Sequence, residues 1–177
     1  MSSNMHHSTA WCMCVLLMLV TSVIHVSLPC RVDGDICQRN SLLKISFPSS
    51  STVRCNELLV RHQTEAMPTV EFAEAERGQN YLFVMLDPDV PSGCSYLHAI
   101  AIVDFQNGQL AFQKRLVDYI QPSPPSGTHR YQMYLYTWPS VDDSVVYERL
   151  PFDVAKLEED NNLNEPVALF QFRVSSN

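Results

Sequence analysis

Short apolar runs, separated by turns that contain Pro, Gly or Ser, follow one another along most of the chain. Residues 81–86 (YLFVML) are continuously apolar and residues 97–105 (LHAIAIVDF) nearly so, which predicts two strands buried on both faces. Residues 67–72 (MPTVEF) alternate between apolar and polar side chains after a proline, as the edge strand of a sheet does. The remaining strand-like segments are 42–47, 57–61, 110–116, 130–138 and 167–174.

One segment, residues 152–160, favours a helix. Pro151 lies near its start, Asp153 comes early, and Val154 and Leu157 fit one face. Many short strands with Pro-rich turns and so little helix predict a mainly β fold, either a sandwich or a distorted sheet. The length of 177 residues argues for one domain, and a hydrophobic content of 46% is enough to form its core.

The first 27 residues contain no Asp, Glu, Lys or Arg, and residues 11–20 (WCMCVLLMLV) are apolar. This pattern predicts a secretory signal peptide over residues 1–27, although its beginning lacks the usual Lys or Arg. Cleavage after Ser22 and cleavage after Ser27 both fit, and we take residues 28–177 as the single domain of a secreted, extracellular protein. An uncleaved membrane anchor is the alternative, but the apolar run is short for a bilayer span.

Four cysteines lie outside the predicted signal peptide: Cys30, Cys37, Cys55 and Cys94. An even number in a secreted domain predicts two disulfides, for which three pairings exist. Their spacing lacks the paired CxxC pattern of structural zinc sites. The formal net charge of -7 argues against nucleic acid as a partner and against non-specific attraction to an anionic membrane.

Two short segments carry the candidate chemistry. Residues 87–91 (Asp-Pro-Asp-Val-Pro) follow directly on the 81–86 strand, with His98 a few residues later, and residues 124–131 read Pro-Pro-Ser-Gly-Thr-His-Arg-Tyr. Their side chains suit a small polar pocket that can hold an anion such as phosphate. The alternative is a Pro-rich turn whose Asp side chains cap backbone N–H groups, with His98 as a satisfied core residue.

His129 and Tyr131 are two residues apart on a predicted strand, so their side chains share one face. Arg130 points to the opposite face, where we expect it to pair with a carboxylate such as Asp89 and to hold the two loops together. This role is structural, without contact to a ligand.

A metal site built from two His and one Asp is a weaker alternative, because neither HxH nor HExxH spacing is present. A Ser-His-Asp hydrolase has still less support, since the chain has no GxSxG motif. We therefore expect no catalytic residues, no metal and no cofactor.

The stretches YLFVMLDPDVPS…LHAIAIVDF and PPSGTHRYQMYLY resemble the phosphatidylethanolamine-binding protein family, whose signature segments are of the type DPDxP…LHW and GxHRY. The resemblance covers roughly residues 42–174 and includes PTVEF and PFDVAKLEEDNNLNEPVALFQF. It implies a central antiparallel sheet packed on a smaller sheet, a Greek-key-like sandwich, with one or two peripheral helices.

The resemblance also implies an anion pocket for a phospholipid head group or another phosphate-bearing ligand, in a non-enzymatic protein. We expect a monomer that can touch a membrane peripherally. The alternative is a protein-interaction role, as a protease or kinase-pathway inhibitor or as an extracellular signal with a receptor. Carried onto this sequence, the pocket residues are Asp87, Asp89, Pro91, His98, His129 and Tyr131.

The sequence departs from the family pattern in three places. Ala99 stands where an aromatic residue usually follows the first motif His, and the loops leading to His98 and His129 are short. The chain also stops at Asn177, soon after the last predicted strand. We expect a more open pocket, with Cys94 tethering its shortened loop through a disulfide.

Overall fold

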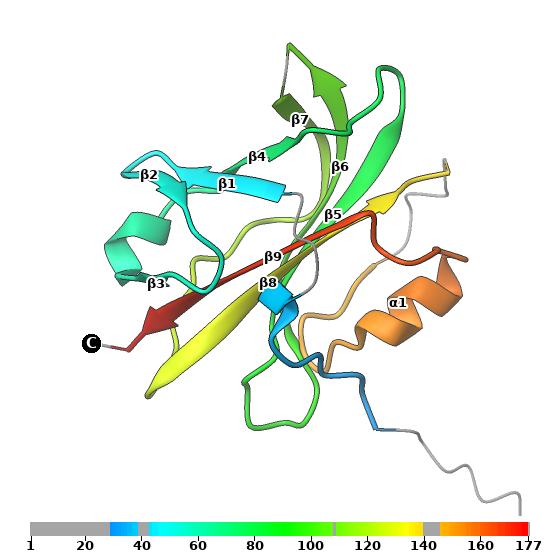
Figure 1. Cartoon of the computed structure of the whole chain (residues 1–177). Coiled ribbons are helices and arrows are strands. Elements are labelled where there is room, and N and C mark those ends of the chain that lie inside the picture. The colour runs from blue at the N-terminus through cyan, green and yellow to red at the C-terminus, as the bar shows by residue number, and fades with distance from the viewer. Residues whose placement is uncertain (1–28, 39–42, 108, 140–145, 177) are drawn as a thin grey trace, which may run out of the picture.

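The computed structural model describes residues 29–38, 43–107, 109–139 and 146–176. The predicted signal peptide lies outside these ranges, so its cleavage and the start of the domain at residue 28 stay predictions. Within them the chain forms nine strands, one α-helix and two 3₁₀ helices (Figure 1). The elements are η1 (Ile36–Gln38), β1 (Leu43–Phe47), β2 (Ser50–Val53), β3 (Leu58–Leu59), η2 (Arg61–Thr64), β4 (Thr69–Phe72), β5 (Asn80–Asp87), β6 (Tyr96–Gln106), β7 (Gln109–Val117), β8 (Thr128–Thr137), α1 (Val154–Asp160) and β9 (Ala168–Ser175).

All nine strands belong to one sheet, in the order β2-β1-β4-β7-β6-β5-β8-β9-β3. At its centre, β5 sends alternate side chains to opposite faces, as the pleat of a strand requires. Phe83 and Met85 enter one hydrophobic core, and Val84 and Leu86 enter a second core on the other face. The prediction of a strand buried on both faces at residues 81–86 is therefore confirmed.

The sheet curls, so that β1, β2 and β4 fold over one face of the central strands (Figure 1). Phe47 of β1 packs edge-on against Phe172 of β9 with ring centroids 5.4 Å apart, although five strands lie between β1 and β9 in the sheet order. The mainly β class is confirmed. A separate smaller sheet is not, because the folded-over strands remain joined to the central strands through the pairing of Val70 with Leu110.

Helix α1 covers the other face of the sheet, where Val154 and Leu157 are buried in the second core. It begins at Val154, because Phe152 is engaged instead in a backbone bridge to Ser95. The Asp153 carboxylate caps the helix by accepting a hydrogen bond from the N–H of Ala155 at 3.0 Å. No helix in the described ranges is long and apolar enough to cross a membrane.

Two details of the β2–η2 region differ from the sequence-based expectation. The Ser-rich stretch after Pro48 contains a strand, Ser50–Val53, because it pairs with β1 across a tight turn. The apolar run at 57–61 gives only the two-residue strand β3, and a 3₁₀ helix begins at Arg61. In both cases tertiary pairing overrides local composition.

We expect Phe47→Ala to lower the free energy of unfolding by about 3–5 kcal/mol, because it removes a buried ring that joins the folded-over strands to β9. Urea unfolding followed by circular dichroism measures this loss. The matched control is Val146→Ala, a residue 87% exposed, which should change the free energy by less than about 0.5 kcal/mol. Equal effects of the two substitutions would contradict the packing of β1 across β9.

Candidate functional site

A cavity of 280 Å³ opens where β5 ends, where β6 begins and beside the loop that leads into β8. Its walls come from the two segments that carry the sequence motifs and from residues 120–125. The lining residues are Asp87, Val90, Tyr96, His98, Ile120, Gln121, Ser123, Pro125 and Tyr131.

Asp87 is the buried carboxylate of this cavity, with an exposure of 3%. One carboxylate oxygen accepts the N–H of Asp89 at 2.8 Å, which forms a turn directly after β5. The other oxygen lies 2.7 Å from Nδ1 of His129. Asp87 therefore caps a backbone N–H, as the alternative reading of the motif expected, and at the same time lines the cavity.

His98 occupies a β-bulge. In the pairing of β5 with β6, Met85 lies opposite Ala99 and Leu86 lies opposite Leu97, so His98 is the extra residue between them. A bulge redirects the side chain of the extra residue, and here the imidazole enters the cavity beside Tyr96 and Tyr131.

The protonation of His98 follows from its surroundings. Nδ1 lies 2.7 Å from the backbone oxygen of Ile120, and because a carbonyl can only accept, Nδ1 carries a proton. Burial lowers the pKa of His98 below its usual value, and Arg149 and His129 lower it further, while the Ile120 carbonyl and Asp87 act in the opposite direction. At neutral pH the ring is therefore neutral, with Nε2 as a hydrogen-bond acceptor.

Tyr131 lines the cavity beside His98. Its ring lies edge-on to His98 at a centroid distance of 5.1 Å and stacks on Phe172 at 5.4 Å. Burial, together with the negative charge of Asp87, raises the pKa of the phenol. The hydroxyl thus keeps its proton, which it donates to the Asp87 carboxylate.

Asp89 and Arg130 form an ion pair next to the cavity. Nε and Nη2 of Arg130 lie 3.1 Å and 2.5 Å from one carboxylate oxygen of Asp89, and the N–H of Arg130 donates to the other at 2.8 Å. Although burial raises the pKa of Asp89, the hydrogen bonds from Arg130 outweigh it and lower that pKa below its usual value. The pair fastens the turn after β5 to the start of β8.

The structure brings three of the six predicted pocket residues to the cavity wall: Asp87, His98 and Tyr131. The other three lie outside the lining, since Asp89 is engaged by Arg130, His129 contacts Asp87, and Pro91 is exposed in the loop.

Pro125 belongs to the second sequence motif, but sequence reasoning missed its neighbours Ile120, Gln121 and Ser123, which complete this wall of the cavity. The Pro-rich composition of that loop was its only signal. Ala99 is fully buried in the first core and does not line the cavity.

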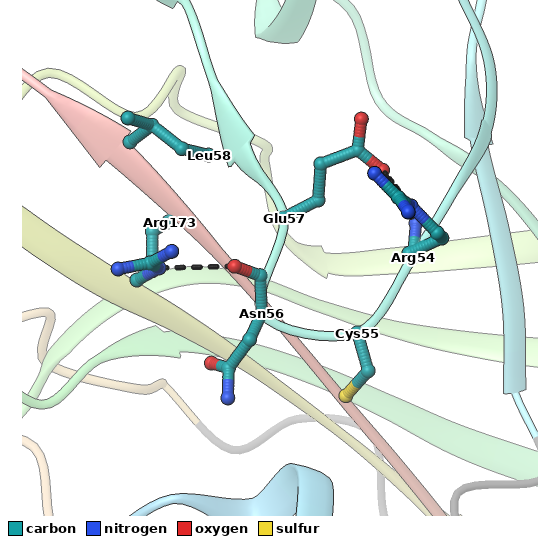
Figure 2. A pocket seen from close by; sticks show the side chains of 6 residues that line it. All are labelled: Arg54, Cys55, Asn56, Glu57, Leu58 and Arg173. Carbon is teal, nitrogen blue, oxygen red and sulfur yellow. Dashed lines mark hydrogen bonds and ion pairs between the residues drawn. The ribbon is translucent and has the colours of Figure 1, made fainter.

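A second, larger depression of 460 Å³ lies beside β3 but has no convergent chemistry (Figure 2). Figure 2 shows Arg54 folded toward Glu57 on one side and Arg173 on the other, bound to the backbone oxygen of Asn56 at 3.0 Å. Because the two guanidinium groups lie apart and each has a protein partner, we do not assign this depression as the site.

Metal binding finds no support in the geometry. Within the described part of the chain, no group of three or more His, Cys, Asp or Glu side chains is placed to hold an ion. His98 and His129 are instead committed through Nδ1 to a carbonyl and a carboxylate respectively.

Comparison with known proteins defines the family. The family model described as phosphatidylethanolamine-binding protein matches residues 46–172, so this chain belongs to that family. Among curated relatives, protein FLOWERING LOCUS T of Arabidopsis thaliana is 31% identical over 150 residues, which cover 78% of this chain and 83% of that protein.

Solved structures share the fold. A carboxypeptidase Y inhibitor, complexed with its cognate proteinase, aligns with a TM-score of 0.66 at 24% identity, over 76% of this chain and 83% of the inhibitor. A phosphatidylethanolamine-binding protein from Plasmodium falciparum aligns with a TM-score of 0.56 at 19% identity, over 75% of this chain and 84% of that one.

We expect Asp89→Asn to lower the free energy of unfolding at neutral pH by about 1–3 kcal/mol, because it breaks a partly buried charged pair. Since the folded pKa of Asp89 is lowered, the pair stabilises the protein above the unfolded value of about 3.9 and loses its effect as pH falls through the folded pKa. Urea unfolding of wild type and variant at several pH values measures both effects.

The control for this prediction is Asp160→Asn, which removes an exposed partner of Lys156 and should lower the free energy of unfolding far less than Asp89→Asn does. At about pH 2 the Asp89 carboxylate is protonated in the unfolded chain. A difference in the free energy of unfolding between wild type and Asp89→Asn that stays constant down to this pH would therefore contradict the prediction.

Proposed function

We propose that this protein binds a phosphate-bearing ligand, such as a phospholipid head group, in the 280 Å³ cavity. The observation that carries the proposal is the meeting of His98 and Tyr131 in one cavity, beside the buried pair of Asp87 and His129. Membership of the phosphatidylethanolamine-binding protein family supports it.

The two rings supply the contacts for a phosphate. Nε2 of His98 donates to a phosphate when the ring takes up a second proton, whereas the hydroxyl of Tyr131, which hydrogen-bonds to Asp87, donates to a phosphate only when it turns away from that carboxylate. Asp87 has spare lone pairs and suits a cationic group such as an ammonium. A head group that combines a phosphate with an amine, such as phosphorylethanolamine, therefore fits the cavity better than a bare anion.

We propose a binding protein and not an enzyme. In the part of the chain that the structure describes, neither His98 nor His129 hydrogen-bonds to a hydroxyl or a thiol, so no activated nucleophile is assembled. Both rings are held in place by fixed acceptors, which suits the orientation of a ligand.

We also propose that the protein is secreted and acts as a monomer. The disulfides Cys30–Cys94 and Cys37–Cys55 support secretion, because such bonds form and persist in oxidising compartments. Contact with a membrane would then be peripheral, through the head group of a bound lipid.

A protease-inhibitor role is the second candidate. An apolar groove of 450 Å³ between α1 and residues 146–153, with Val146 and Leu150 exposed at or near its edge, offers a surface for a protein partner. The solved inhibitor–proteinase complex supports this candidate only through the shared fold. Titration against a panel of carboxypeptidases would test it, and failure of all members to form a complex would dismiss it.

Isothermal titration with phosphorylethanolamine tests the main proposal. We expect saturable binding to the wild type and an affinity lower by about tenfold to hundredfold in His98→Asn, which removes a charge-assisted hydrogen bond. The matched control is His62→Asn, at an exposed position of η2, which should bind like the wild type. No binding by a folded wild type would refute the proposed function.

The affinity should also rise as pH falls. Because the pKa of free His98 lies below the usual value of about 6.5, the ring gains its second proton only under mildly acidic conditions, and a bound phosphate favours that form. His98→Asn should show a flatter pH profile of affinity. This comparison separates the uptake of a proton by His98 from the titration of the phosphate itself. Identical profiles for wild type and variant would contradict this mode of binding.

The same lowered pKa destabilises the free protein in acid. Between the folded pKa and about 6.5, the unfolded chain binds more protons at His98 than the native state, so stability falls as pH decreases. Thermal unfolding from about pH 8 to pH 5 should show this fall in the wild type and a smaller one in His98→Asn. An equal fall in both proteins would mean that groups other than His98 cause the loss of stability in acid.

A further inference from the structure

A segment that the sequence patterns did not predict lies across the face of the sheet that α1 also covers. We call residues 30–38 the N-terminal strap. At one end Cys30 is bonded to Cys94, and near the other end Cys37 is bonded to Cys55. Between the two disulfides Ile36 is buried in the second core, so the strap is anchored to the protein at Ile36 as well as at its two disulfides.

The strap supplies partners for buried polar groups of β8. Gln132 is fully buried on this face of the sheet and donates from Nε2 to the backbone oxygen of Gly34 at 2.7 Å. The hydroxyl of Tyr134 donates to the Asp33 carboxylate at 2.9 Å. Because buried polar groups without partners cost free energy, these contacts fix where the strap lies.

One guanidinium joins the strap to the cavity wall. Arg130 donates from Nη1 to the backbone oxygen of Asp33 at 3.1 Å, while its Nε and Nη2 hold Asp89. Asp89 belongs to the loop of residues 88–95, and its neighbour Val90 lines the cavity. The same loop is bonded covalently to the strap through Cys94.

The loop 88–95 is thus fastened to the strap at both of its ends. Arg130 connects the strap to Asp89 near the beginning, and the disulfide connects it to Cys94 near the end. Between them Gly93 adopts a φ of 77°, a conformation that glycine reaches without strain. Without the disulfide, the strap stays connected to Asp89 through Arg130 but loses its covalent bond to the end of the loop.

We propose that the strap positions the cavity wall formed by residues 88–95, and that the Cys30–Cys94 disulfide makes ligand affinity depend on its redox state. This inference rests on the proposed function of the cavity. A dithiol reductant cleaves the S–S bond by giving two electrons and two protons, which leaves two cysteine thiols and an oxidised dithiol. The freed loop then has conformational entropy to lose when a ligand binds, which weakens binding.

The second disulfide provides a matched control. Cys37–Cys55 fastens the same strap, but Cys55 lines the depression beside β3 and not the candidate cavity (Figure 2). Both bonds involve partly exposed cysteines, so their removal differs mainly in which loop is released.

Isothermal titration with phosphorylethanolamine is the main test, on the oxidised wild type, Cys30→Ser/Cys94→Ser and Cys37→Ser/Cys55→Ser. We expect the affinity of Cys30→Ser/Cys94→Ser to fall about tenfold and that of the other double variant to stay within about twofold of the wild type. Dithiothreitol should reproduce the loss in Cys37→Ser/Cys55→Ser, where only the first disulfide remains, and reoxidation should restore binding. Equal affinities throughout would overturn the proposal.

Amide hydrogen exchange separates failure of this inference from failure of the proposed function. Residues 88–95 should exchange faster in Cys30→Ser/Cys94→Ser than in the wild type or the control variant. This readout decides the positioning role even if the wild type binds no phosphorylethanolamine, and unchanged exchange would overturn it. If Cys30→Ser/Cys94→Ser does not fold, the same exchange is measured on Cys37→Ser/Cys55→Ser before and after dithiothreitol.

Discussion

A buried carboxylate at the end of the central strand is the constraint around which the candidate site is built. Asp87 can remain charged there only if donors surround it, because an unpaired carboxylate in the core costs several kcal/mol or more. The N–H of Asp89 and the imidazole of His129 meet this need. In doing so they fix the turn after β5, the orientation of His129 and one wall of the cavity.

The charges around the cavity explain why a proton should accompany the ligand. Asp87 is negative, Tyr131 keeps its proton, and His98 is neutral at neutral pH because it is buried. A phosphate placed in this cavity lies near Asp87 and needs a compensating positive charge. The second proton of His98 supplies it, and an amine on the ligand would lessen the repulsion further.

Much of the fold follows from periodicity and composition, whereas the shape of the site depends on tertiary contacts. The buried strand at 81–86 was predictable because it is apolar at every position, and the two motifs identified Asp87, His98 and Tyr131. The bulge at His98 was not predictable, because it arises from the pairing of two strands and is not visible in the sequence of either strand. The strap and the lining residues Ile120, Gln121 and Ser123 were missed for a similar reason, because their positions depend on buried side chains of distant strands.

Whether His98 binds the phosphate as a cation can be measured by following its imidazole resonances through a pH titration by NMR. We expect a pKa below about 6.5 for His98 in the free protein and a higher pKa when phosphorylethanolamine is bound. The resonances of His62, which is exposed on η2, serve as the internal reference and should not move when ligand is added. A His98 pKa that does not change with saturating ligand would mean that His98 does not bind the phosphate as a cation.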